Sequence, residues 1–219
     1  CPSCEDNSSD AELLKAKQLL AQIPTCIGVH QTALDGKDPV KPDPSLGHAA
    51  NLLWCMTGVK PHSIATKVMD VSLMLYAEHD FNASTFTSRV ISSTNSDLHS
   101  CVCGGIGALK GNLHGGANEA AMETIEKFNS REEANEGIKK ILENKEKIMG
   151  FGHAVYTNED PRNKIVKAWA KKLGTFNGDS LLYEVSEEVE KVMSEEKDLF
   201  ANTDFYMASA YHYLGIPTP

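Results

Sequence analysis

Hydrophobic residues recur every three to four positions along most of the chain, which is the spacing of amphipathic helices. The alternation of apolar and polar residues that marks half-buried strands never persists. We therefore predict an all-α fold. Its helices are expected at residues 10–23, 46–58, 63–76, 132–144, 161–173, 181–199 and 205–214.

Individual residues predict where several of these helices begin and end. Pro24 is expected to stop the first helix, and Gly58 is expected to cap the second. Pro161 suits the first position of its helix, and Gly174 is expected to end that helix. Residues 34–45 carry three prolines and alternating charges, so we predict a loop there.

Two segments of the first half favour burial. Residues 63–76 are apolar on more than one side, which predicts a position inside a bundle or at an interface. Residues 84–102 are rich in small and β-branched residues, and the alternation typical of strands does not last there either. We include this second segment in the helical prediction.

The composition fits a globular protein of one large or two modest domains. Of the 219 residues, 41% are hydrophobic, which suits a substantial core. The formal net charge of −9 argues against nucleic-acid binding, which needs a basic face. The sequence shows neither an apolar run long enough to span a membrane nor a signal peptide, so we predict a cytoplasmic protein.

The character of the chain changes near Asn118. The second half is more highly charged, and its helices are predicted to be shorter and more solvated. We predict a domain boundary here, with residues 1–115 in a large helical domain and residues 116–219 in a smaller and more mobile one.

Two histidines lie in glycine-rich settings. "GNLHGGANE" places His114 directly before Gly115, and "GFGHAVY" places His153 directly after Gly152. Glycine allows positive φ and close approach of backbone or ligand. A turn with an incidental histidine explains the first motif equally well. The second lacks the preceding strand that a dinucleotide-binding motif requires.

Three further residues could bind or activate a substrate, although each has a structural alternative. Arg162 stands at a predicted helix start, where it could clamp a carboxylate or simply be solvated. His79 lies between two acidic residues that could do no more than hold it. Asp204 begins an apolar helix, where it could act as a base or only cap the helix.

This set of residues suits carbon–carbon bond formation on carboxylate substrates. Imidazoles can polarise carbonyl oxygens, a guanidinium can hold a carboxylate, and an aspartate can take a proton next to a thioester. A metalloprotein is the alternative from another class, because Cys1-Pro-Ser-Cys4 has zinc-ligand spacing. A second cysteine or histidine pair does not follow at a useful distance, so we predict no metal.

Four motifs, in this order and at these intervals, resemble the citrate synthase family: "MLYAEHDFNASTFTSRV", "GALKGNLHGGANEAAMETI", "KEKIMGFGHAVYTNEDPRN" and "NTDFYMASAYHYLGIPTP". The resemblance runs from about residue 46 to the end. The wording of "GHAVYTNEDPRN" and "LGIPTP" is most similar to the bacterial 2-methylcitrate synthases. The resemblance to the family implies a two-domain all-α fold and a homodimer formed through helices around residues 63–102.

The resemblance also implies an activity. The chain would condense propionyl-CoA or acetyl-CoA with oxaloacetate to give 2-methylcitrate or citrate plus CoA. The coenzyme A thioester would be a substrate, and a cofactor would not be needed. An ordinary citrate synthase specific for acetyl-CoA and a non-catalytic truncated fragment are the alternatives.

The family's functional residues transfer to matching positions of this sequence. His114 matches the donor to the thioester carbonyl, and Asp204 matches the base that removes the α-proton. His153 matches the residue that polarises the oxaloacetate carbonyl and then helps hydrolyse the thioester. His79 and Arg162 match oxaloacetate ligands. The loop that cradles the CoA adenine matches Lys147, Ile148, Met149, Gly150, Phe151 and Gly152.

The sequence departs from the family's pattern in places. Asn112 stands where proline is common, and Ala154 stands where arginine or proline is frequent. The chain also stops before the part that supplies two more oxaloacetate-binding arginines. We therefore expect a fragment that is weakly active or inactive by itself.

Overall fold

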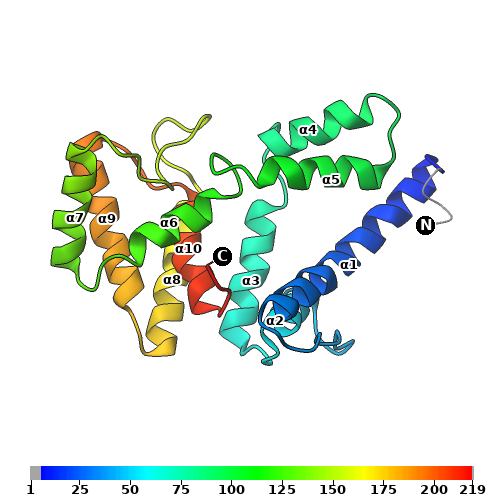
Figure 1. The fold of residues 1–219 in the computed structure, drawn as a ribbon, viewed down its shortest axis with the longest axis horizontal. Helices are drawn as coiled ribbons and strands as arrows, with labels where there is room; N and C mark the ends of the chain where they lie inside the picture. Colours follow the sequence, from blue (N-terminus) through cyan, green and yellow to red (C-terminus); the bar gives the residue numbers. More distant parts are fainter. Residues whose placement is uncertain (1–5, 219) are drawn as a thin grey trace. The chain divides into compact units, whose positions relative to one another are not determined.

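The computed structural model describes residues 6–218, and this part of the chain is built from α-helices without a strand, which confirms the all-α prediction (Figure 1). The one β pairing among these residues is an isolated bridge between Phe151 and Ala201. No helix in the described range is both long and apolar enough to cross a membrane. The helices are α1 Ser9–Leu34, α2 His48–Thr57, α3 Ser63–Tyr76, α4 Ala83–Ser92, α5 Leu98–Leu109, α6 Ala117–Ile125, α7 Arg131–Glu143, α8 Asn163–Asn177, α9 Leu181–Lys197 and α10 Thr203–Tyr213.

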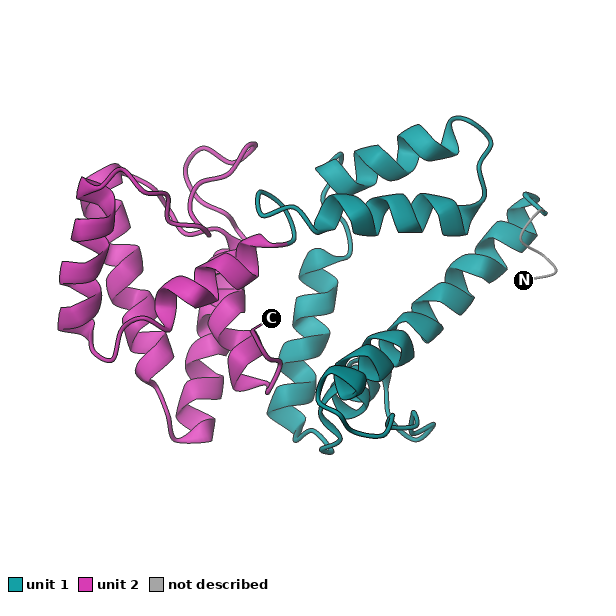
Figure 2. Ribbon diagram, in the orientation of Figure 1, with its two compact units in different colours: residues 1–115 teal, residues 116–219 magenta. Residues whose placement is uncertain are grey.

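The chain divides into two compact units (Figure 2). Unit 1, Cys1–Gly115, holds α1 to α5, and unit 2, Gly116–Pro219, holds α6 to α10. In unit 1, α1 packs on α2, α2 packs on α3, and α4 packs on α5. In unit 2, α10 packs against α6, α8 and α9. The assignment of these units to a large and a small domain of a longer protein stays a prediction.

The first helix does not end at Pro24, and this prediction was wrong. Helix α1 runs from Ser9 to Leu34 with Pro24 buried inside it. Proline removes one backbone hydrogen bond, but the following residues are held by packing on α2. A Cβ built on Gly28 would lie 2.5 Å from Cys55 Cβ, so the two helices touch closely there. This tertiary contact outweighs the local cost of the proline.

The segment 84–102 is not one helix. It forms α4 and the start of α5, separated by a turn in which Asn95 has a φ of 61°. Asp97 then caps α5, because its side chain accepts a hydrogen bond from the Ser100 amide. Helix α6 was not among the predicted elements, since nine residues give the periodic pattern little length in which to show.

The ends of α8 also differ from the prediction. The helix begins at Asn163 with Arg162 as its N-cap, so Pro161 lies before it, and it continues to a left-handed cap at Gly178. Gly174 lies inside the helix for a packing reason. A Cβ there would sit 3.1 Å from the Tyr213 hydroxyl, so glycine lets α8 approach α10. Gly58 caps α2 in the left-handed conformation, as predicted.

Helix α10 is the centre of unit 2. Nearly all its residues from Thr203 to Ala210 are buried, which explains why its pattern is apolar on all sides. The Tyr206 hydroxyl donates to Glu190 of α9 at 2.6 Å. Burial, together with the Glu190 charge, raises the pKa of Tyr206 well above its ordinary range, so the phenol stays a donor. This bond anchors α10 to α9 just after Asp204.

Candidate active site

In unit 1, His114 is bound to the N-terminal turn of α4. Its Nε2 lies 3.3 Å from the Ser84 backbone nitrogen and 2.9 Å from the Ser84 hydroxyl oxygen. A backbone N–H can only donate, so Nε2 carries the lone pair, and we infer that the ring proton is on Nδ1. The sequence does not reveal this pairing, because 30 residues separate the two partners. His79 lies in the segment between α3 and α4, partly buried.

Gly115 explains the glycine-rich character of the turn at His114. A Cβ on Gly115 would lie 2.5 Å from the Leu109 carbonyl oxygen, so the turn folds back on the end of α5. The turn is closed by a hydrogen bond from the His114 amide to the Gly111 carbonyl. Glycine is therefore required at position 115, because a side chain there would collide with the backbone at the end of α5.

In unit 2, His153 is held through its other ring nitrogen. The backbone amides of Val155 and Tyr156 donate to Nδ1 at 3.0 and 3.2 Å. Since both partners are backbone donors, Nδ1 is an acceptor, and we infer that the proton is on Nε2. The ring also lies 4.6 Å from the Tyr156 ring, centroid to centroid. The backbone donors thus select opposite ring nitrogens as acceptors, Nε2 in His114 and Nδ1 in His153.

The loop 147–152 is bound to the segment that leads into α10. The Gly152 amide donates to the Phe200 carbonyl, and the Asn202 amide donates to the Gly150 carbonyl, both at 2.9 Å. The Asn202 side chain donates to the Gly152 carbonyl at 3.0 Å. These bonds join the predicted CoA-binding loop to the start of the helix that bears Asp204.

Gly150 is expected to be the least replaceable glycine of this loop. Its φ is +88°, and a Cβ would lie 2.8 Å from Phe205 Cβ. Gly150→Ala should combine left-handed strain of about 1–2 kcal/mol with overpacking of about 1–3 kcal/mol. The control is Gly178→Ala, which has a φ of +71° but meets no described atom within 4 Å. Denaturant unfolding should show a larger loss for Gly150→Ala; equal losses would contradict the close packing.

Asp204 lies in the first turn of α10 but is not its cap. Asn202 is the N-cap, and its side-chain oxygen accepts a hydrogen bond from the Asp204 amide at 3.0 Å. The Asp204 carbonyl accepts a hydrogen bond from the Asn118 side chain of α6 at 2.8 Å. The backbone of Asp204 is therefore held from two sides, and its carboxylate is not needed for capping. The N-terminal end of a helix also stabilises a negative charge.

Arg162 is held by a buried carboxylate, so it is not the solvated surface residue of the structural alternative. Its guanidinium Nε and Nη2 donate to Asp160 at 3.0 and 2.8 Å. Burial alone would raise the pKa of Asp160, but the hydrogen bonds and charge of Arg162 outweigh it and hold that pKa below its usual value. Asp160 also accepts a hydrogen bond from the Thr203 amide at 3.0 Å.

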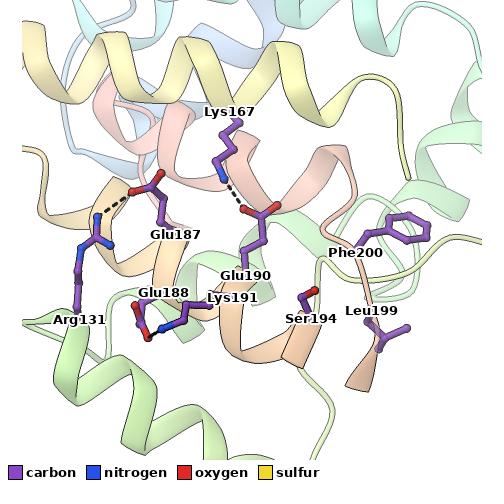
Figure 3. Close-up of a pocket in the computed structure, with 9 residues that line it drawn as sticks. All are labelled: Arg131, Lys167, Glu187, Glu188, Glu190, Lys191, Ser194, Leu199 and Phe200. Carbon is purple, nitrogen blue, oxygen red and sulfur yellow. Dashed lines mark hydrogen bonds and ion pairs between the residues drawn. The ribbon is translucent and has the colours of Figure 1, made fainter. Parts of the chain in front are cut away.

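A surface cavity of about 410 Å³ lies on α9 and faces α7 and α8, and its lining includes none of the residues predicted for the site (Figure 3). Its charges pair with one another. Lys167 lies 2.5 Å from Glu190. Arg131 lies 2.7 Å from Glu187. Because these cations are neutralised by carboxylates, the cavity does not present the excess positive charge that an anionic substrate requires. Its lining is Arg131, Lys167, Glu187, Glu188, Glu190, Lys191, Ser194, Leu199 and Phe200.

A cluster of ligands that could hold a metal does not occur among residues 6–218. Cys1 and Cys4, the pair with zinc-ligand spacing, lie outside the described residues.

Unit 2 brings three of the predicted elements together. Asn202 connects the loop 147–152 to α10, and Asp160 connects Arg162 to the residue before Asp204. His114 and its Ser84 partner belong to unit 1.

The sequence analysis did not identify four residues that hold the predicted site residues in place: Ser84, Asn118, Asp160 and Asn202. Only Asn202 had a local signal, an asparagine directly before an apolar helix.

Comparisons with known proteins agree with one another. The family model described as citrate synthase, C-terminal domain, matches residues 2–219. A Shewanella oneidensis protein named 2-methylcitrate synthase is 53% identical over 93% of this chain and 54% of its own length. A Heyndrickxia coagulans protein named citrate synthase is 46% identical over 94% of this chain and 56% of its own length. The chain thus spans about half the length of these curated relatives.

A solved structure shares the fold. It is the ternary complex of carboxymethyl coenzyme A and oxaloacetate with citrate synthase from the archaeon Thermoplasma acidophilum. The TM-score is 0.90 at 29% sequence identity, covering 96% of this chain and 57% of that one.

Proposed function

The chain belongs to the citrate synthase family, and on that premise we propose that the protein of which it forms part condenses an acyl-CoA with oxaloacetate. The products are a tricarboxylic acid, 2-methylcitrate or citrate, and free CoA. The observation that carries the proposal is the arrangement around α10. There, an aspartate that is not needed as a cap is held beside the loop 147–152 and the Asp160–Arg162 pair.

Enolisation of the acyl-CoA is the first step. The α-proton beside a thioester is weakly acidic, so its removal needs a base and a donor acting together. Asp204 takes the proton. His114 donates its Nδ1–H to the thioester carbonyl as that oxygen gains charge. The Ser84 amide supports this role because it fixes Nε2 as an acceptor.

Oxaloacetate is held and polarised by three residues. Arg162 and His79 bind it, and His153 donates its Nε2–H to the ketone oxygen. The enol carbon attacks the ketone carbon, a carbon–carbon bond forms, and the ketone oxygen takes the proton that His153 Nε2 donates. His153 then takes a proton from the water that attacks the thioester carbonyl, and the leaving CoA sulfur takes the proton that Asp204 removed. The backbone donors on Nδ1 of His153 support this role because they leave Nε2 as the donor.

The CoA portion binds at the loop from Lys147 to Gly152. Gly150 and Gly152 have positive φ, which turns this backbone. Hydrogen bonds join the loop to the segment that leads into α10, the helix that carries Asp204. Binding of the CoA portion at this loop is therefore linked, through these hydrogen bonds, to the helix that carries the base.

The acyl group is propionyl, with acetyl also accepted. The 53% identity to a protein named 2-methylcitrate synthase supports this choice over a strict citrate synthase. One methylene in an apolar pocket changes specificity by about 10- to 200-fold.

The protein acts as a homodimer through helices around residues 63–102. Large apolar side chains on α4 and α5 remain exposed in unit 1 and support this. Phe86 is 60% and Ile106 is 57% exposed.

A free-thiol assay on the full-length protein tests the activity. We expect thiol release that needs oxaloacetate and is faster with propionyl-CoA than with acetyl-CoA at equal concentration. Release that does not depend on oxaloacetate would indicate a simple thioesterase. Absence of release with either acyl-CoA would favour the non-catalytic alternative, and a strong preference for acetyl-CoA would favour an ordinary citrate synthase.

A further inference from the structure

Asp160 is a buried carboxylate of unit 2 that accepts hydrogen bonds on both of its oxygens. Its side chain is fully buried, whereas that of Arg162 is 15% exposed. Oδ1 accepts hydrogen bonds from the Arg162 backbone amide and from Nε, both at 3.0 Å. Oδ2 accepts from Nη2 at 2.8 Å and from the Thr203 amide at 3.0 Å. Four donors therefore converge on one carboxylate, and three of them belong to Arg162.

This geometry determines which edge of the guanidinium meets a ligand. The Nε–H and one Nη2–H form the side-on edge of arginine, and Asp160 occupies that edge. The end-on edge, formed by Nη1 and Nη2, is the other edge at which a guanidinium can bind a carboxylate in a bidentate pair. Without Asp160, the long side chain of Arg162 would lose the partner that selects this orientation.

The bond to Thr203 adds a second connection. Thr203 is the first residue of α10 and directly precedes Asp204. The same carboxylate thus holds both Arg162 and the beginning of the helix on which Asp204 lies. A displacement of Arg162 would therefore shift the buried Asp160 and, with it, the N-terminal end of α10.

We propose that Asp160 is a positioning residue, which orients the Arg162 guanidinium for a substrate carboxylate and ties it to the start of α10. The proposal rests on the oxaloacetate-binding role given to Arg162 in the proposed function. Asp160 does not contact substrate. Its effect on oxaloacetate affinity acts through Arg162, so that effect should depend on Arg162.

The test is a double-mutant cycle in the full-length protein, with oxaloacetate affinity measured by calorimetry and turnover by thiol release. The variants are Asp160→Asn, Arg162→Gln and the double substitution. Asp160→Asn should raise the oxaloacetate Kd and KM by about 10- to 100-fold, with the acyl-CoA KM changed less than about threefold. In the Arg162→Gln background, the same substitution should change oxaloacetate affinity by less than about threefold.

The matched control is Glu159→Gln, which removes the neighbouring carboxylate from an exposed pair with Lys164 at 2.7 Å. It should leave oxaloacetate affinity unchanged. Thermal unfolding of each variant reports folding. If Asp160→Asn does not fold, Asp160→Glu, which keeps the charge but moves it by one methylene, takes its place in the cycle.

The outcomes separate the two proposals. Active wild type with a large, Arg162-dependent effect supports the positioning role. Active wild type with unchanged oxaloacetate affinity in Asp160→Asn, or with additive effects in the cycle, overturns the positioning role and leaves the proposed function standing. A wild type that neither binds oxaloacetate nor releases thiol overturns the proposed function, and the positioning role with it.

Discussion

Asp204→Asn is expected to reduce turnover in the full-length protein by about 10²- to 10⁴-fold, because it removes the base that takes the α-proton. Oxaloacetate affinity should stay within about twofold, since Arg162, His79 and His153 remain. Folding should also be retained, because Asn202 and not Asp204 caps α10. Steady-state thiol release, calorimetry with oxaloacetate and thermal unfolding measure the three quantities.

Asp198→Asn is the matched control for this substitution. Asp198 is an exposed aspartate that caps α9 in the left-handed conformation, with a φ of 53°, which asparagine also tolerates. Its turnover should equal that of the wild type. A loss of folded protein in Asp204→Asn with no change in turnover per folded molecule would instead identify Asp204 as a structural residue.

His114→Ala should reduce kcat by about 10²- to 10³-fold, the usual cost of removing one donor to a developing oxyanion. The KM for acyl-CoA should change much less, because the donor acts mainly when charge appears on the thioester oxygen. His114 is only partly buried, so we expect the variant to fold. The measurement is the dependence of thiol release on acyl-CoA concentration at saturating oxaloacetate.

Ser84→Ala tests whether the Ser84 hydroxyl or the Ser84 backbone amide sets the tautomer of His114. The substitution removes one hydrogen-bonding partner of His114 but keeps the backbone amide that fixes Nε2 as an acceptor. We expect less than about a tenfold loss of kcat. A loss as large as that of His114→Ala would show that the hydroxyl, not the backbone amide, sets the tautomer.

A rise in acyl-CoA KM with unchanged kcat in His114→Ala would reduce His114 to a binding role.

The fold was predictable where the chain carries long amphipathic periods, as in α7 and α9. It was not predictable where packing decides against local preference. Pro24 lies inside α1 because that helix packs on α2, closely at Gly28. Gly174 lies inside α8 because it lets that helix approach Tyr213. In both cases the residue type predicted an end, and a contact from elsewhere in the chain kept the helix going.

The residue types of the site were accessible from the sequence, but their supports were not. His114 and His153 were candidates because of their glycine-rich settings and the family resemblance. Their tautomers depend on backbone amides, which carry no sequence signature. Asp160 stands two residues before Arg162, yet only the structure distinguishes it from the neighbouring acidic residue, by its burial and by its bonds to Arg162 and Thr203.

The most direct measurement is a crystal structure of the full-length protein with oxaloacetate and carboxymethyl-CoA, an analogue that cannot react. We expect the Asp204 carboxylate and His114 Nδ1 at about 2.6–3.2 Å from the carboxymethyl group, or bridged to it by one water molecule. His153 Nε2 should lie at a similar distance from the ketone oxygen of oxaloacetate. Both ligands bound with Asp204 or His114 directed away from the carboxymethyl group would contradict the assignment of base and donor.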